Sequence, residues 1–181
     1  MPTAQSPMSI SKVGLVTVAA TLFATAFAQE GPNLGVTPSP ELLAAWDISV
    51  AADGTGLPPG SGTAIDGASV YTRNCLACHG QEGEGLLHDR LVGGHGTIGG
   101  PAPTKTVGSY WPYATTIFDY IRRAMPYLQP QTLSDDETYA LTAYLLYLNG
   151  IIDADQVMNA ATLPEVEMPN LKNFVLAYPE A

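Results

Sequence analysis

The residues best suited to chemistry lie together in the segment Cys75-Leu76-Ala77-Cys78-His79. On a helix, two cysteines three positions apart lie about one turn apart on the same face. Both sulfurs can therefore form thioether bonds with the vinyl groups of one porphyrin, and the imidazole of His79 can then bind its iron. The spacing predicts one covalently attached haem c and a protein that transfers single electrons rather than an enzyme.

Two other interpretations use the same residues. A zinc site takes four ligands, and the only sulfur and imidazole donors in the chain apart from methionine are Cys75, Cys78, His79, His88 and His95. A thioredoxin-like dithiol has the same cysteine spacing, but it is expected between a strand and a helix. Haem attachment is favoured over both.

A haem iron that carries electrons needs a second axial ligand, and a methionine thioether is a common one because it raises the reduction potential. Met125 is the favoured candidate, since it lies between the haem loop and the last predicted core helix. Met168 lies beyond that helix, and Met158 is expected to pack on a helix face. His88 and His95 are alternatives, but each is expected to be a loop residue near the haem edge.

An aromatic cluster, Tyr110-Trp111-Pro112-Tyr113, precedes the helix that leads to Met125. One interpretation is hydrophobic cover for the haem. The other is that the Trp111 indole or the Tyr113 hydroxyl donates a hydrogen bond to a haem propionate, whose charge would be costly to bury unpaired. Both stay open, and both make Trp111 and Tyr113 candidate cofactor-binding residues.

Arg122 and Arg123 follow on the same predicted helix, three and four positions after Asp119. They are either a solvated pair beside Asp119 or contacts to a haem propionate or a partner protein, and the solvated interpretation is favoured. The chain carries 7 basic and 17 acidic residues, for a net charge of −10. Nucleic acid is therefore not an expected partner, whereas the acidic surface suits a basic protein or serves solubility alone.

Helical periodicity and capping signals predict an all-α fold with three core helices around the haem. Asp66 is expected to cap the first, and the capping box that begins at Ser134 predicts the clearest one, which ends at Asn149-Gly150. The Gly-rich stretch 80–106 is expected to be an irregular loop that wraps the haem. The expected helices span residues 66–78, 115–124 and 135–148, with shorter ones at 41–48, anchored on the domain by Trp46, and at 153–160.

The sequence predicts that the chain is divided into four parts. Residues 1–28 have the pattern of an export signal, with Lys12, an apolar run shorter than a membrane span and the cleavage site Ala26-Phe27-Ala28, so a periplasmic location without a membrane span in the mature chain is expected. Residues 29–64 form an extended arm, 65–150 the haem domain and 151–181 a C-terminal extension packed on that domain. Leu171, Phe174 and Tyr178 are expected to hold the extension.

The stretch from Thr106 to Pro126, followed by Leu133 to Gly150, resembles the monohaem class I cytochromes c that serve sulfite and sulfur oxidation. Leu57-Pro-Pro-Gly-Ser-Gly and Leu91-Val-Gly-Gly add to the likeness, which covers about residues 57–174. It is strongest to the cytochrome subunit of the Sox sulfur dehydrogenase and to cytochromes of periplasmic sulfite dehydrogenases.

The resemblance implies a class I cytochrome c fold, with His79 and Met125 as the axial ligands. It also implies a molybdenum-cofactor dehydrogenase subunit as electron donor and a cytochrome or oxidase as acceptor. The Sox subunit carries two haem domains, whereas this chain has one Cys-x-x-Cys-His segment. The expectation is therefore a single-haem partner of a sulfite dehydrogenase, with the arm and the extension as docking surfaces, or a diffusible carrier that feeds an oxidase.

Overall fold

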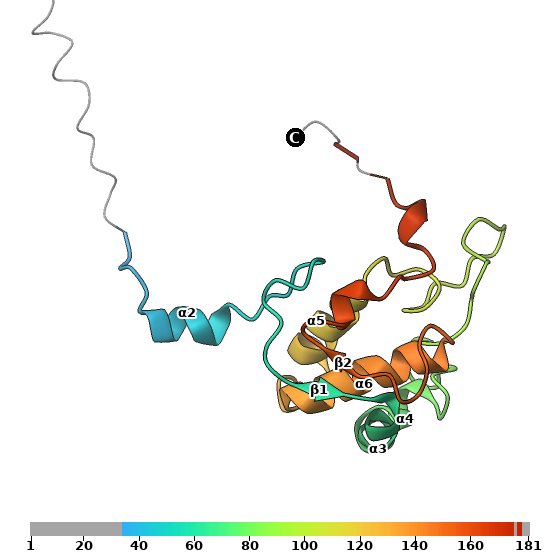
Figure 1. The fold of residues 1–181 in the computed structure, drawn as a ribbon, viewed down its shortest axis with the longest axis horizontal. Helices are drawn as coiled ribbons and strands as arrows, with labels where there is room; N and C mark the ends of the chain where they lie inside the picture. Colours follow the sequence, from blue (N-terminus) through green and yellow to red (C-terminus); the bar gives the residue numbers. More distant parts are fainter. Residues whose placement is uncertain (1–33, 176, 179–181) are drawn as a thin grey trace, which may run out of the picture. The chain divides into compact units, whose positions relative to one another are not determined.

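The computed structural model describes residues 34–175 and 177–178 (Figure 1). The predicted export signal lies outside these residues. The part of the chain described here has no helix long and apolar enough to cross a membrane. The elements are α2 (Pro40–Trp46), β1 (Ser61–Gly62), α3 (Ala64–Asn74), α4 (Leu76–His79), α5 (Ala114–Ala124), α6 (Asp135–Leu148), β2 (Met158–Asn159) and the 3-10 turns η1 (Leu163–Glu165) and η2 (Leu171–Asn173).

Helix α3 begins with a capping box that the sequence only half revealed. The side-chain oxygen of Thr63 accepts the N–H of Asp66, and the Asp66 carboxylate accepts the N–H of Thr63. Thr63 is therefore the N-cap and Asp66 the third residue of the helix, so the prediction that Asp66 caps it was wrong by three positions. The reciprocal bonds satisfy two N–H groups near the helix start.

A close crossing of α3 and α6 builds the core, and Figure 1 shows α3 almost end-on below α6. A Cβ atom on Gly67 would lie 2.0 Å from the carbonyl oxygen of Ala140, so only glycine fits at this contact. Against the other side of α6, the ring centroids of Phe118 and Tyr139 lie 4.4 Å apart. The two contacts fix α3 and α5 around α6.

The structure confirms the predicted positions of the two helices that flank Met125. Helix α6 begins after the Ser134–Glu137 capping box and ends at Asn149, with Gly150 in the left-handed region at φ +66°. Helix α5 begins one residue earlier than predicted, after Tyr113. Apart from the two-residue pair β1–β2, the described elements are helical, which confirms the predicted all-α class.

The C-terminal extension differs from its prediction in two ways. No helix forms at residues 153–160; instead β2 pairs antiparallel with β1. Leu163 and Met168, which were not predicted as anchors, are buried in the same core as α5 and α6. Of the predicted anchors, Leu171 is half-buried and the Phe174 ring lies 5.5 Å, centroid to centroid, from that of Tyr110. Tyr178 is exposed, so its predicted role was wrong.

Helix α2 confirms the predicted short helix, although it ends two residues early. The prediction that Trp46 anchors it on the domain was wrong, because the Trp46 side chain is 80% exposed. What fixes the chain here is the segment after the helix, residues 48–52, whose backbone binds side chains of α5.

Candidate haem site

The Cys-x-x-Cys-His segment lies where α3 gives way to α4. Cys75 leaves the helical conformation, with φ −123° and ψ −35°, so α3 ends and α4 begins around it. Its carbonyl oxygen accepts the N–H groups of Cys78 at 3.1 Å and His79 at 3.0 Å. This single turn holds the three residues in the order that thioether attachment and iron ligation require.

Both cysteines are free and half-buried. Burial, with a smaller contribution from the nearby Cys78, raises the pKa of the Cys75 thiol to about 11. Reactive dithiols depend on a lowered thiol pKa, so the shift has the wrong direction for a thioredoxin-like pair. Among the described residues, no three His, Cys, Asp or Glu side chains converge on a metal-sized space.

His79 is oriented by the loop that follows it. Its Nδ1 lies 2.8 Å from the backbone carbonyl oxygen of Asp89. A carbonyl can only accept a hydrogen bond, so Nδ1 carries the proton and donates the hydrogen bond. This leaves Nε2 as the unprotonated nitrogen that can bind a metal. The sequence pattern did not indicate Asp89, because the contact uses its backbone.

The start of that loop is fixed by Tyr71 of α3. The Tyr71 hydroxyl donates to the carbonyl oxygen of Gly80 at 2.8 Å, and burial raises the pKa of this phenol, so it stays protonated and a donor. The Tyr71 ring also lies 5.2 Å from that of Tyr144 on α6. The end of the predicted haem-binding segment is therefore tied to both core helices.

Asn149, at the C-cap of α6, fixes the middle of the loop. Its side-chain amide donates to the carbonyl of Leu91 at 3.2 Å and accepts the N–H of Gly93 at 3.1 Å. The Thr106 hydroxyl then donates a hydrogen bond to the carbonyl oxygen of Gly93 at 2.7 Å. These bonds join positions 13 to 58 residues apart, so the Gly-rich loop is positioned by polar contacts although it has no helix or strand.

The two other histidines lie in this loop. The ring of His88 lies 6.2 Å, centroid to centroid, from the rings of both His79 and Tyr127, so it stands between the motif histidine and the chain beyond Met125. His95 is exposed. These positions suit the expectation of loop residues near a haem edge.

Met125 is the C-cap of α5, where its N–H donates to the carbonyl of Ile121 at 3.0 Å. The side chain is half-buried and packs against the core. Met158 is fully buried and Met168 is 1% exposed, both within the core cluster. Of the three, Met125 alone is partly accessible at the end of an element.

The aromatic candidates lie just before α5. Trp111 is half-buried and stands edge-on to Tyr120, with ring centroids 5.6 Å apart. Tyr113 is the N-cap residue of α5 and is partly exposed. Both rings therefore lie beside the helix that ends at Met125. Their contacts do not distinguish hydrophobic cover of the haem from a hydrogen bond to a haem propionate, so both interpretations stay open.

Arg122 and Arg123 have structural partners that the sequence did not reveal. Arg122 is mostly buried and pairs with Asp135, 3.3 Å from Nε, while its Nη1 donates to the carbonyl of Ile48 at 3.3 Å. Arg123 pairs with Asp119, which is buried and accepts the N–H of Val50 at 2.9 Å. The favoured interpretation of a solvated pair was therefore incomplete, because both cations help to fix the segment before the domain on α5.

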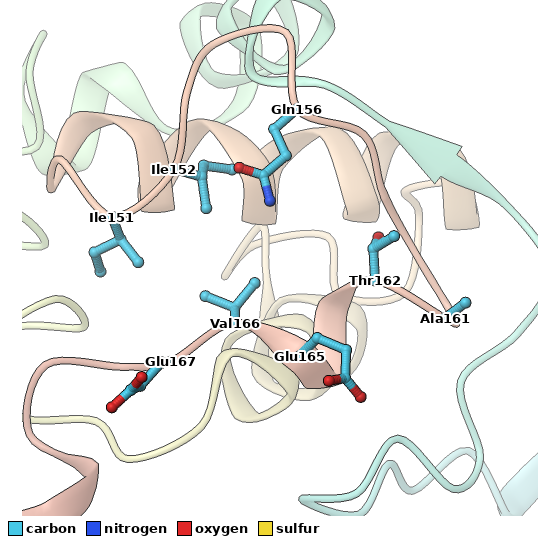
Figure 2. A pocket seen from close by; sticks show the side chains of 8 residues that line it. All are labelled: Ile151, Ile152, Gln156, Ala161, Thr162, Glu165, Val166 and Glu167. Carbon is cyan, nitrogen blue, oxygen red and sulfur yellow. The ribbon is translucent and has the colours of Figure 1, made fainter.

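A cavity of about 390 Å³ lies elsewhere, wholly within the C-terminal extension, and Figure 2 shows Ile152 and Val166 facing one another across it. None of the predicted haem residues borders it. Its lining consists of Ile151, Ile152, Gln156, Ala161, Thr162, Glu165, Val166 and Glu167.

The donor set fits haem c. Two thiols stand one turn apart, Nε2 of His79 is available for iron, and a thioether stands at the end of α5. Bound haem would supply the change between iron(III) and iron(II) that one-electron transfer requires. The chain would supply the attachment, and it already holds the histidine tautomer and the surrounding loop.

Comparisons with known proteins give the family of the chain. Residues 62–145 match the family described as cytochrome c oxidase, cbb3-type, subunit III. The structure is similar to a chain of the sulfane dehydrogenase SoxCD from Paracoccus pantotrophus, with 43% sequence identity and a TM-score of 0.77. The similarity covers 83% of this chain and 75% of that one. The chain has the class I cytochrome c fold and belongs to the cytochromes c associated with sulfur dehydrogenases.

Proposed function

We propose that this protein is a periplasmic cytochrome that accepts single electrons from a molybdenum-dependent sulfite or sulfur dehydrogenase and passes them to the respiratory chain. The observation that carries the proposal is the 43% identity, over 83% of the chain, to a chain in the structure of a sulfane dehydrogenase. An electron-transfer protein in a sulfur-oxidising context follows from the family, and the donor, the acceptor and the location are the proposed part.

In this proposal Cys75 and Cys78 attach one haem, and His79 and Met125 bind its iron. The support is the Nδ1–H of His79 held by Asp89 and the half-buried Met125 at the end of α5. Trp111 and Tyr113 contact the haem or its propionates. Residues 1–28 are removed on export, 29–64 form the arm, 65–150 the haem domain and 151–181 the extension.

The test mixes the oxidised holoprotein with the candidate molybdenum dehydrogenase and follows haem reduction by absorbance. We expect reduction only when sulfite or a sulfane substrate is added. Dithionite provides the control for a reducible haem. If dithionite reduces the haem but the dehydrogenase with either substrate does not, the proposed donor is wrong.

A second candidate is a diffusible carrier that feeds a terminal oxidase from several dehydrogenases. The match of residues 62–145 to a family named after an oxidase subunit favours it. Comparable reduction rates with several unrelated donors would support this candidate, whereas a stable complex with one dehydrogenase, seen by co-purification, would support the first.

A further inference from the structure

The cavity of about 390 Å³ in the C-terminal extension is a groove with an aliphatic interior and polar edges. Ile152 is buried and Val166 is half-buried, and Figure 2 shows the two side chains facing one another across the groove. Gln156, Glu165 and Glu167 also line it, and all three are exposed. The groove therefore offers apolar contact and carboxylate oxygens to the same ligand.

The turn beside the groove is fixed before any partner binds. The side-chain oxygen of Asn159 accepts the N–H groups of Ala161 at 2.8 Å and Thr162 at 3.0 Å. The Thr162 hydroxyl donates a hydrogen bond to the carbonyl of Val157 at 2.8 Å, and the next residue, Leu163, is fully buried in the core. A wall that is already ordered loses little conformational entropy when a partner binds to it.

The charge of the groove is negative. Glu167 forms an ion pair with Lys172, whereas Glu165 takes part in no ion pair among the described residues. Asp153 and Asp155, in the segment that forms the groove, are also exposed. Carboxylates at the edge of an apolar contact favour Lys or Arg on a partner.

We propose that this groove binds a lysine or arginine side chain of the electron-donor protein, with Glu165 as its ion-pair partner. The inference rests on the proposed function and names the surface by which the donor is held. The aliphatic stem of Lys or Arg packs along apolar surface while the charged head stays at its edge. Ile152 and Val166 suit the stem, and Glu165 suits the head.

A second copy of this chain is not the expected occupant, because its own cations are already engaged. Of the seven Lys and Arg residues, only Lys12 lies outside the described ones. The Nζ of Lys105 lies 4.7 Å from the ring centroid of Tyr110, and the Nε of Arg90 donates to the carbonyl of Glu84 at 3.2 Å. The others form ion pairs within the chain: Arg73, Arg122, Arg123 and Lys172. The net charge of −10 also makes two copies repel one another.

The groove uses none of the residues proposed to hold the haem. Neither residues 75–79 nor Met125 line it. A partner seated in the groove can therefore stay bound while the haem passes its electron to an acceptor. This suits a donor in a lasting complex with the cytochrome.

The test measures reduction of the holoprotein by the molybdenum dehydrogenase and its substrate. Glu165→Lys is expected to raise the KM for the cytochrome about 10-fold or more, with kcat nearly unchanged, since it places a cation where the partner's cation binds. Asp47→Lys makes the same change in net charge at an exposed residue outside the groove and is the control. At physiological salt, where charges more than about 8 Å apart are largely screened, it should leave the KM nearly unchanged.

A second pair of variants tests the groove by its shape. Ala161 lines the groove and is exposed, so the indole of Ala161→Trp is expected to fill it and raise the KM by a similar factor. The neighbouring Ala160 is exposed but does not line the groove, so Ala160→Trp is the matched control and should keep the KM. Reduction by dithionite and an unchanged haem spectrum verify that each variant is folded.

The outcomes separate this inference from the proposed function. If the unaltered cytochrome is reduced and Glu165→Lys and Ala161→Trp keep its KM, the groove is not the docking site and the proposed donor stands. Equal effects of the two tryptophan variants would also overturn the groove. If dithionite but not the dehydrogenase reduces the unaltered cytochrome, the donor and the groove are both wrong. If Glu165→Lys instead dissociates an oligomer of the cytochrome alone in size-exclusion chromatography, the groove serves a second copy and the inference fails.

Discussion

The Nδ1–H of His79 donates a hydrogen bond to the backbone carbonyl oxygen of Asp89 at 2.8 Å. A backbone acceptor makes this contact independent of the side chain at position 89 but dependent on the course of the loop. That course is set from a distance by Asn149, which binds Leu91 and Gly93 just beyond Asp89. The orientation of the proposed iron ligand is therefore determined partly at the end of α6.

Asn149→Asp tests this dependence. The carboxylate can still accept the N–H of Gly93, but the carbonyl of Leu91 loses its donor, and the carbonyl of Leu145 keeps only the backbone N–H of Asn149. We expect the free energy of unfolding to fall by about 1–3 kcal/mol, since a partly buried acceptor is left unpaired, and the reduction potential to shift. Asp89→Ala keeps the carbonyl and is the control, expected to remain within about 0.5 kcal/mol in chemical denaturation. Equal behaviour of the two variants would contradict the role of Asn149.

Met125→Ala is expected to remove the second axial ligand. The ferric protein should lose the weak long-wavelength absorption band of iron–thioether ligation, and the reduction potential should fall because thioether ligation raises it. Met168→Leu conserves volume in the core and is the control, expected to keep both properties at a stability cost under about 1.5 kcal/mol. Persistence of the band in Met125→Ala would refute the assignment.

Arg122→Gln tests whether the ion pair with Asp135 stabilises the loop that begins at Met125. Arg122 and Asp135 lie at the two ends of residues 123–134, and the pair is partly buried. Its loss is expected to cost about 1–3 kcal/mol and to lower the pH at which alkali removes the long-wavelength band. The control is Arg73→Gln, which breaks the more exposed pair with Glu137, also in the first turn of α6. Arg73→Gln should lower the free energy of unfolding by under about 1 kcal/mol and leave the pH dependence of the band unchanged. Equal effects of the two variants would contradict the role of Arg122 in positioning the loop that begins at Met125.

Acid should weaken the start of α3. Hydrogen bonds from the side chain and then the backbone of Thr63 lower the pKa of Asp66. A lowered folded-state pKa gives stability that is present above the ordinary carboxyl pKa, about 4, and is lost as the pH falls below it. The Tm difference between the unaltered protein and Asp66→Asn should therefore be constant near neutral pH and shrink below about pH 4. A difference that grows in acid would have the wrong sign.

Local patterns predicted the elements that local interactions determine. The Ser134–Glu137 capping box and the Asn149-Gly150 stop fixed α6, and periodicity fixed α5 to within one residue. At α3 the prediction named Asp66 as the cap, whereas Thr63, three residues earlier, is the residue with extended backbone that caps the helix.

The missed features depend on contacts between distant residues. Asp119 looks like a surface carboxylate in sequence, yet it is buried because it binds Val50, 69 positions away. Nothing near Asp89 in the sequence shows that its carbonyl faces His79. In the extension, the pairing of β2 with β1 places Met158 opposite Gly62, and this pairing replaced the expected helix.

The intact mass of the exported protein, measured after acid extraction of unbound haem, tests the central claim most directly. We expect one species with the mass of the chain from Gln29 plus one haem, and the chain mass alone for the variant Cys75→Ala/Cys78→Ala. Haem that acid extracts from the unaltered protein, leaving only the mass of the polypeptide, would contradict covalent attachment at Cys75 and Cys78.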